Sequence, residues 1–345
     1  MNRISISCFF VVCLLTASRL LANDFEGEDL SLRFPAGLSG FSSYADVAAK
    51  GGASAASKYG SSINPAASAW SFPDAYDFGL SEQYSNLAFD QGTRLHFISE
   101  SALVDAHQFG VIRFSFGNVT SNDHPFHGSG PFDFTYDLWG GRVDWAKRWG
   151  SFAAGAAYTY SESETTLRTG EGIFAETIRR TSLGRIGLQW QPADRWLIGA
   201  VGDYGYAPMH TDYFLQTLLG PATIKTHDIT RQWVARAGVA YEWLKKNPHA
   251  LLQLDYLHGH FWNDTGSLDT DRFSFGGDLP LAEFFYVRAG AMVDVRGDFG
   301  WTAGLGIYPH EGVFIDLAYQ NDLFPELQRE FGHSRTLNAS VSVQF

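Results

Sequence analysis

The stretch "LNASVSVQF", Leu337–Phe345, alternates apolar and polar residues up to the last position of the chain. Successive side chains of a β-strand point to opposite faces. The odd-numbered residues of this stretch are all apolar and would share one face, and the even-numbered residues are all polar and would share the other. The pattern therefore predicts a strand that runs to Phe345 with one apolar face.

The same alternation recurs upstream, in "QWVARAGVAYEW" at 232–243, "FFYVRAGAMVDV" at 284–295 and "VFIDLAYQ" at 313–320. A soluble sandwich also alternates, with its apolar face inward. Two features favour a membrane barrel instead. The runs reach the roughly ten residues that a tilted membrane-crossing strand needs. Apolar rows also begin and end with aromatic residues, as with Trp233 and Trp243, and such pairs fit the two interfacial girdles of a barrel.

Connection lengths support the barrel, because tight turns such as "VDAH" and "QPAD" alternate with long segments such as "NVTSNDHPFHGSG" and "NDLFPELQREFGH". A break of parity at Gly140-Gly141 is interpreted as a β-bulge. We predict an all-β, antiparallel transmembrane barrel of about fourteen strands, with twelve as the alternative because the first and tenth are the weakest. The predicted strands are residues 82–90, 93–103, 107–117, 132–147, 150–163, 176–190, 195–207, 228–244, 249–261, 267–278, 283–295, 299–308, 312–321 and 334–345.

Residues 1–22 differ from the rest of the chain. A basic start, the apolar run "ISISCFFVVCLLTAS" and Ala22 before "NDFEGED" predict a secretory signal peptide cleaved near Ala22. Both cysteines, Cys8 and Cys13, lie in this segment, so we expect no disulfide in the mature protein. The segment holds two arginines and no acid, so its removal takes the formal charge from −12 to −14. This acidity argues against a nucleic-acid partner. No later apolar run is long enough for a membrane helix.

Residues 23–81 do not alternate like strands and are rich in Gly, Ala and Ser. The stretch "GGASAASKYGSSINPAASAW" at 51–70 contains the tripeptide Asn64-Pro65-Ala66. Pro65 favours an extended backbone at Asn64, and the Asn64 amide can bond nearby backbone in a turn. Small residues also allow close packing against a crowded lumen wall. We therefore expect residues 23–81 to form a plug, or hatch, inside a barrel of residues 82–345.

A small-residue run leading into Asn-Pro-Ala resembles the N-terminal hatch of the outer-membrane long-chain fatty-acid and hydrocarbon transporters of the FadL/TodX type. The resemblance is architectural over the mature chain and literal only near residues 51–70. It implies a hatch-plugged barrel in a Gram-negative outer membrane that passively admits hydrophobic small molecules, with no cofactor. Some related barrels are associated with secretion instead. A terminal strand ending in Phe345 also resembles the signal that the barrel-assembly machinery recognises.

Strand parity places charged residues of both signs on the inward face, because they are costly in hydrocarbon. We predict two alternatives for them: a network that holds wall and hatch together, or a polar conduit past the hatch. An ion-selective pore is not favoured, since neither sign dominates. The inward set is Arg94, Glu100, Arg113, Arg142, Asp144, Arg185, Asp203, Arg236, Glu242, Asp255, Arg272, Arg288, Asp294 and Asp316.

The long connections contain apolar residues that are candidates for capturing a hydrophobic ligand. In "DYFLQTLLG", at 212–220, they fit the stripe of a short helix, and "NDLFPELQREFGH" adds others from 321 to 333. The alternative is that they pack on one another and cap the barrel. The candidate capture residues are Tyr213, Phe214, Leu215, Leu218, Leu219, Phe324 and Phe331, with Leu323 and Leu327 nearby.

Enzymatic and metal-binding interpretations receive little support. His124 and His127 lie near Asp123, but no Cys or compact carboxylate cluster accompanies them. Ser101, Asp105 and His107 lack a recognisable oxyanion arrangement. We therefore predict a non-enzyme without cofactor or metal. The leading hypothesis is an uptake channel whose partners are outer-membrane lipid and a hydrophobic small molecule. The second is a scaffold that binds exported proteins, and a nonspecific porin is disfavoured because a hatch would block the lumen.

Overall fold

The structure is a computed structural model. It describes residues 30–38, 42, 45–57, 63–70, 78–90, 92–121, 125–126, 132–169, 172–217, 220–244 and 250–345. The predicted signal peptide lies outside these residues. No helix among the described residues is long and apolar enough to span a membrane.

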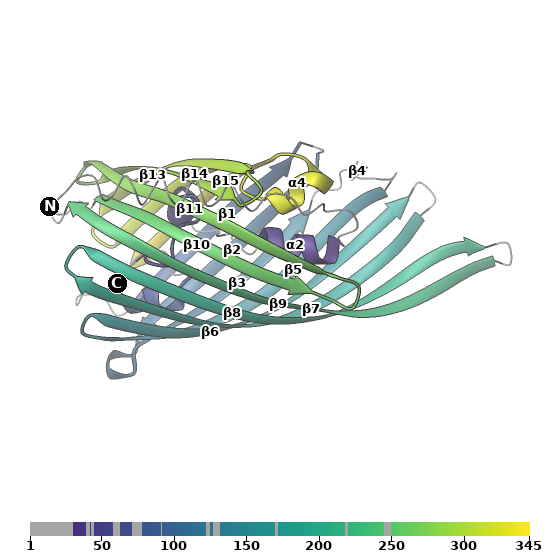
Figure 1. Cartoon of the computed structure of the whole chain (residues 1–345), viewed down its shortest axis with the longest axis horizontal. Helices are drawn as coiled ribbons and strands as arrows, with labels where there is room; N and C mark the ends of the chain where they lie inside the picture. Colours follow the sequence, from purple (N-terminus) through teal and green to yellow (C-terminus); the bar gives the residue numbers. More distant parts are fainter. Residues whose placement is uncertain are drawn as a thin grey trace.

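The described strands form one antiparallel sheet that closes into a barrel (Figure 1). Of the fifteen strands, fourteen make up the wall, and β4 (Pro125–Phe126) only adds two residues beside β5. Closure comes from the pairing of β3 with β5 and of β1 with β15. The wall strands are β1 (Phe78–Phe89), β2 (Arg94–Asp105), β3 (Val111–Ser121), β5 (Phe132–Trp149), β6 (Phe152–Thr169), β7 (Gly172–Ala193), β8 (Trp196–Thr217), β9 (Gly220–Leu244), β10 (Ala250–Trp262), β11 (Ser267–Ala282), β12 (Phe285–Asp294), β13 (Phe299–His310), β14 (Val313–Asn321) and β15 (Ser334–Gln344).

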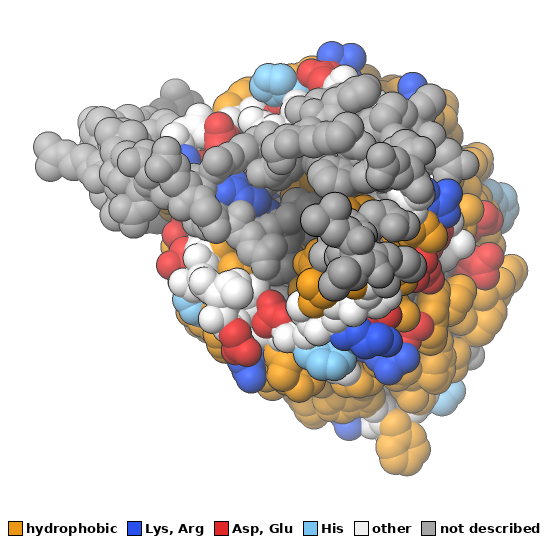
Figure 2. Space-filling model, turned by 90° about the vertical axis from the view of Figure 1, so that its right-hand side faces the viewer, with side chains coloured by type: hydrophobic (Ala, Val, Ile, Leu, Met, Phe, Trp, Pro, Cys, Tyr) orange, Lys and Arg blue, Asp and Glu red, His pale blue; other side chains and the backbone are white. Residues whose placement is uncertain are grey.

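The predicted alternation decides which face of each strand meets the lumen. In β15, Leu337 and Val341 are 54% and 44% exposed, whereas Thr336 and Asn338 are 1% and 0% exposed. The apolar row thus points outward, and the polar row is buried inside the barrel. Seen from the long-loop end, hydrophobic side chains cover the flanks and charged ones gather around the rim (Figure 2). The prediction of a fourteen-stranded barrel with an apolar exterior is confirmed.

The first and last strands meet at the short-turn end of the barrel. The Phe345 N–H donates to the Phe78 carbonyl at 2.8 Å, and the Phe78 N–H donates back at 3.3 Å. Their rings stack with centroids 6.2 Å apart. The chain therefore ends with its terminal backbone paired, and β1 begins four residues before its predicted start at residue 82.

Two local predictions about the wall strands are wrong. Gly140 and Gly141 keep an unbroken register with both β3 and β6, so no bulge occurs there. Instead, the inward row of β5 changes from polar to apolar toward the mouth of the barrel, where Tyr136 and Leu138 pack inside. Residues 107–109 form a 3-10 turn, η2 (His107–Phe109), and β3 starts only at Val111.

The longest predicted loop is a strand hairpin rather than a loop with a helix. β8 and β9 are 22 and 25 residues long and pair as far as Thr217 and Gly220. They extend beyond the neighbouring strands (Figure 1). The β-branched residues of "ATIKTHDIT", at 222–230, favour extended backbone. Residues 212–217 are therefore strand, and the helical stripe predicted for 212–220 is wrong.

The membrane-facing role of the outward row can be tested with two isoleucines of similar exposure. Ile198 is 43% exposed in the outward row of β8, and Ile224 is 50% exposed on the protruding hairpin. Ile198→Arg should lower the free energy of unfolding by about 2–4 kcal/mol in a lipid bilayer, because it places a charge in hydrocarbon. Ile224→Arg should change it little. Urea titration of both variants in vesicles measures the difference, and equal losses would contradict the membrane placement.

Candidate functional site

The described part of the N-terminal segment lies against the inner wall of the barrel. It comprises α2 (Leu30–Leu38), α3 (Ala45–Ala48), the turn that follows α3, and the 3-10 helix η1 (Pro65–Trp70). Helix α3 contacts β13, β14 and β15, and η1 contacts β3, β5, β6 and β7. Many of its residues are fully buried, among them Ala48, Ala55 and Ala66. The segment thus reaches opposite sides of the lumen wall.

Inward-facing glycines let the segment approach the wall backbone. A Cβ built on Gly199 of β8 would lie 1.8 Å from the Ala55 carbonyl oxygen. One on Gly187 would lie 2.0 Å from Asn64 Oδ1, and one on Gly290 would lie 2.3 Å from the Lys50 carbonyl carbon. Only glycine fits where two backbones come this close. The wall therefore carries glycines, spread over several strands, at positions where the N-terminal segment lies against it.

Asn64 joins this segment to itself and to the wall. Its Nδ2 donates to the Ala55 carbonyl at 2.6 Å and to the Leu188 carbonyl of β7 at 3.2 Å. Its Oδ1 accepts the Ala66 N–H at 3.0 Å, which caps the first turn of η1. The expected turn at Asn64-Pro65-Ala66 is present, and both Nδ2 and Oδ1 of the Asn64 side chain form hydrogen bonds.

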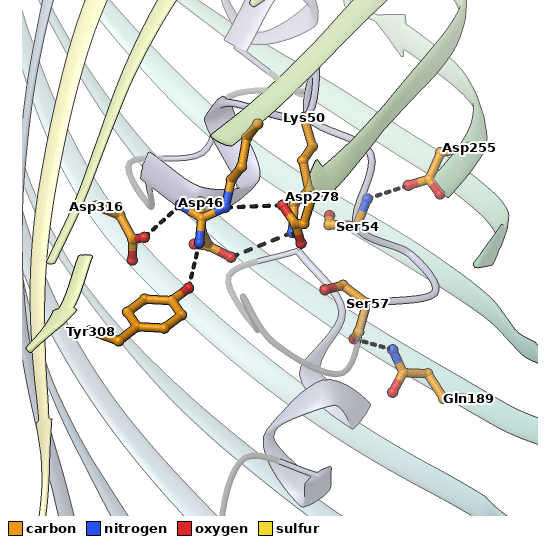
Figure 3. A network of polar contacts seen from close by, with 10 residues as sticks. Asp46, Lys50, Ser54, Ser57, Gln189, Asp255, Asp278, Tyr308 and Asp316 are labelled. Atoms are coloured by element: carbon orange, nitrogen blue, oxygen red, sulfur yellow. Dashed lines mark hydrogen bonds and ion pairs between the residues drawn. The ribbon is translucent and has the colours of Figure 1, made fainter. Parts of the chain in front are cut away.

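Asp255 of β10 is a second attachment point. One of its carboxylate oxygens, Oδ2, accepts the Ser54 N–H at 2.7 Å (Figure 3). It also accepts the Ala55 N–H at 2.7 Å. Arg236 of β9 donates to the Gly52 carbonyl at 2.9 Å and lies 3.9 Å from Asp255 Oδ2. Gln189 of β7 donates to the Ser57 carbonyl at 2.7 Å. Charged wall residues here bind backbone of the N-terminal segment.

A third attachment is an ionic network around Lys50 (Figure 3). The Lys50 ammonium lies 3.7 Å from Asp46 and 3.5 Å from Asp278 of β11. Arg288 of β12 pairs with Asp278 at 2.9 Å and with Asp316 of β14 at 2.5 Å. It also donates to the Tyr308 hydroxyl. Breaking one member of such a buried network leaves an uncompensated charge, so it fixes the segment tightly.

The predicted lumen residues mostly face inward. Arg113, Arg236, Arg272, Arg288, Asp294 and Asp316 are buried, and Arg142 and Arg185 pair with Asp144 and Asp203. Arg94 and Glu100 are exceptions. Both are exposed on the outward row of β2, because Leu95 and Phe97 of that strand point inward. Their assignment to the lumen is therefore wrong.

The long-loop end of the barrel contains an apolar cluster. Helix α4 (Pro325–Phe331) follows β14, and its Leu327 and Phe331 are 0% and 1% exposed. They pack with wall residues Phe89 and Phe97. Phe324 and Phe331 therefore do not form the exposed apolar surface expected from the sequence, but lie in a buried core. The cluster comprises Leu87, Phe89, Leu95, Phe97, Val119, Tyr136, Met292, Leu323, Phe324, Leu327 and Phe331.

Of the other candidate capture residues, Tyr213 and Phe214 lie on β8 in the β8–β9 hairpin. Phe214 is 37% exposed and belongs to the outward row, while Tyr213 is on the inward row and its ring lies 6.0 Å from that of Phe174. The side chain of Leu215 and both Leu218 and Leu219 lie outside the described residues. The structure therefore does not bring the two predicted halves of the capture set together.

Arg272 of β11 links helix α4 to the N-terminal segment. Its guanidinium pairs with Glu326 of α4 and donates to the Ala36 carbonyl of α2 at 3.0 Å. Both charged side chains are almost completely buried. Beside them, a cavity of about 20 Å³ is lined by Arg236, Arg272 and Phe324, among others. That volume suits about one water molecule.

Carboxylates also gather at the rim near α4. Burial raises the pKa of Asp298, which lies in the turn between β12 and β13, and Glu326 and Asp322 contribute in the same direction. Arg296 opposes this shift.

The residues considered for catalysis have structural partners. The Ser101 hydroxyl lies 2.6 Å from that of Ser81, and Asp105 accepts the backbone N–H of His107 at 2.7 Å. Asp123, His124 and His127 lie outside the described residues. In the described part of the chain, no group of three or more His, Cys, Asp or Glu side chains is placed to hold a metal ion.

Solved structures with the same architecture exist. The Pseudomonas putida toluene transporter TodX aligns with a TM-score of 0.54 and 14% identity, over 86% of this chain and 96% of that chain. The two chains share one fold. A Pseudomonas aeruginosa FadL homologue aligns with a TM-score of 0.52 and 12% identity, over 87% and 97% of the two chains. No family model matches the sequence, and no curated protein matches it either. The resemblance inferred from the hatch motif is thus confirmed at the level of fold.

These close approaches at glycines predict a selective way to displace the N-terminal segment. In Gly199→Val, the new side chain meets Ala55, whereas Gly202 of the same strand faces outward with nothing within 4 Å of an added Cβ. Gly199→Val should raise single-channel conductance in planar bilayers, and Gly202→Val should match the parent. Heat-modifiable gel migration checks that both barrels are folded. Equal conductance of all three proteins would mean that the segment does not obstruct the lumen.

Proposed function

We propose that this protein is an outer-membrane channel for the passive uptake of hydrophobic small molecules. Two observations support the proposal: the fold shared with TodX and the FadL homologue, and the apolar cluster inside the mouth of the barrel. A lipid-facing exterior and a closed sheet suit a bacterial outer membrane. The ligand would belong to the hydrocarbon or long-chain fatty-acid class.

The apolar cluster is the observation that carries this proposal. Phe89, Leu95 and Phe97 face the lumen at the long-loop end, whereas inward residues deeper in β1 and β2, such as Gln83 and Ser101, are polar. Ligand sites are typically apolar concavities with a few polar groups. Helix α4 covers the cluster, so an apolar molecule could enter by replacing its side chains.

Residues 23–81 would serve as the hatch in this channel. The supporting contacts come from three parts of the wall: Asp255, the Lys50–Asp278 pair and the Asn64 turn. The charged lumen set would then act mainly as the network that holds hatch and wall together. Signal-peptide cleavage near Ala22 and recognition of Phe345 by the assembly machinery remain predictions.

Uptake by reconstituted vesicles tests the channel directly. Vesicles with the protein should take up labelled toluene or a labelled long-chain fatty acid faster than protein-free vesicles, while a labelled hexose should enter at the background rate. The pair of hydrophobic probes also decides between the two ligand classes. If both enter at the protein-free rate and an exported protein co-purifies with the barrel, the scaffold hypothesis replaces this one.

The apolar cluster can be tested with neighbouring residues of β2. Phe97 points into the cluster and is 8% exposed, whereas Ile98 points outward and is 44% exposed. Phe97→Ser should weaken the binding of a hydrophobic ligand about tenfold, because a polar group replaces a ring in an apolar site. Ile98→Ser should leave affinity unchanged. Fluorescence titration in detergent measures both, and equal affinities would place the ligand site elsewhere, for instance at Phe214 on the hairpin.

A further inference from the structure

Three neighbouring strands carry polar side chains on the face that points away from the lumen. We call this set the polar strip. Its members alternate with buried, inward-facing residues of the same strands. The polar strip consists of Glu82 and Asn86 of β1, His96 and Glu100 of β2, and Asn118 and Thr120 of β3, and Arg94 continues the outward row of β2 toward the long-loop end.

Glu82 and Glu100 are register partners on adjacent strands, and both are exposed. Glu82 lies between Leu80 and Tyr84 in its outward row, and Glu100 lies between Ile98 and Ala102. The next outward residues across the sheet are Val341 of β15 and Phe116 of β3. The two carboxylates therefore lie side by side among apolar side chains. They are between the bands of aromatic residues at the two ends of the outer surface.

Hydrocarbon is an unfavourable environment for this pair. A charged side chain on the lipid face destabilises a barrel most near the middle of the membrane, and like charges directly opposite each other on a sheet repel. Neither carboxylate forms an ion pair with any described residue of the chain. The other strip members are amide, hydroxyl and imidazole groups, which also prefer hydrogen-bonding partners to lipid.

A second copy of the barrel would not remove this unfavourable placement of charge. Two copies in one membrane are related by a twofold axis along the membrane normal, so each residue meets the facing copy at the same depth. A contact through the polar strip would then bring Glu82 and Glu100 of one copy against the same residues of the other. Charge complementarity instead requires a cation at that depth.

We propose that the polar strip is an interaction surface for a different membrane-embedded protein, one that presents a Lys or Arg side chain at the depth of Glu82 and Glu100. An ion pair that is shielded from water is effective only when its geometry is close. Each of the two carboxylates offers the pair of oxygens that an Arg guanidinium matches. The amide and hydroxyl groups nearer the long-loop end would add hydrogen bonds to the same partner. The proposal requires the membrane placement of the barrel but not its transport activity.

Photocrosslinking in native outer membranes tests the proposal. A benzophenone amino acid replaces Ile98, which lies between the strip members His96 and Glu100, or Ile198 of β8, which is 43% exposed on a different part of the exterior. We expect a discrete protein adduct from position 98 and none from position 198. Combining position 98 with Glu82→Gln and Glu100→Gln should reduce the adduct about tenfold, since the charge attraction is lost. Glu82→Lys with Glu100→Lys should abolish it.

Two controls keep the outcome interpretable. Heat-modifiable migration should show that the Gln variants are folded, because they only remove outward charges. Their uptake of hydrophobic probes should equal that of the parent, which separates this surface from the channel. An adduct that is absent, that persists undiminished in the Gln variants, or that has the mass of two copies of this chain would overturn the proposal.

Discussion

The pairing of every wall strand with two neighbours is the constraint on which the rest of the structure depends. Backbone N–H and C=O groups have no hydrogen-bonding solvent in hydrocarbon, so an open sheet edge is not tolerated there. The link from β3 to β5 and the link from β1 to β15 remove both edges. Once the sheet is closed, the two-residue period of each strand divides its side chains into an outer set and a lumen set. The position of a residue along its strand therefore decides whether its side chain faces the outside of the barrel or the lumen.

The sequence predicts this division well wherever the lumen is polar. In β9, β12 and β15 the apolar rows face outward, and the charged or amide residues Arg236, Arg288 and Asn338 are buried inside. The rule fails at the mouth of the barrel. There the inward residues Leu95 and Phe97 pack under α4, so the outward positions of β2 include Arg94 and Glu100. An apolar row in a strand indicates that it faces either a buried core or lipid. Only the position of helix α4, which covers the row in β2, distinguishes these two environments.

Other parts of the site could not be predicted because they depend on contacts distant in sequence. In the sequence, a glycine at 199 or 290 indicates only a residue with low strand propensity. Its role becomes evident from the backbone of residues 50–55, which lies against it in the structure. Asp255 reads as one lumen charge among many, yet it accepts two N–H groups from the N-terminal segment. The Asn64 turn was predictable because its bond to Ala66 is local. The β8–β9 hairpin was not, since strand pairing continues beyond the point where the alternation of apolar and polar residues stops.

In the proposed channel, the polar and apolar regions of the lumen would have different roles. Deep in the barrel, charged side chains bind backbone groups and one another, and such networks lose most of their stability when a single member is displaced. At the mouth, the contacts of α4 are mainly apolar and can exchange one hydrophobic partner for another at little cost. Arg272 belongs to both regions, because it binds Glu326 of α4 and the Ala36 carbonyl of α2. An apolar molecule that displaced α4 would therefore disturb a buried ion pair, and through it the N-terminal segment, without having to enter the charged part of the lumen first.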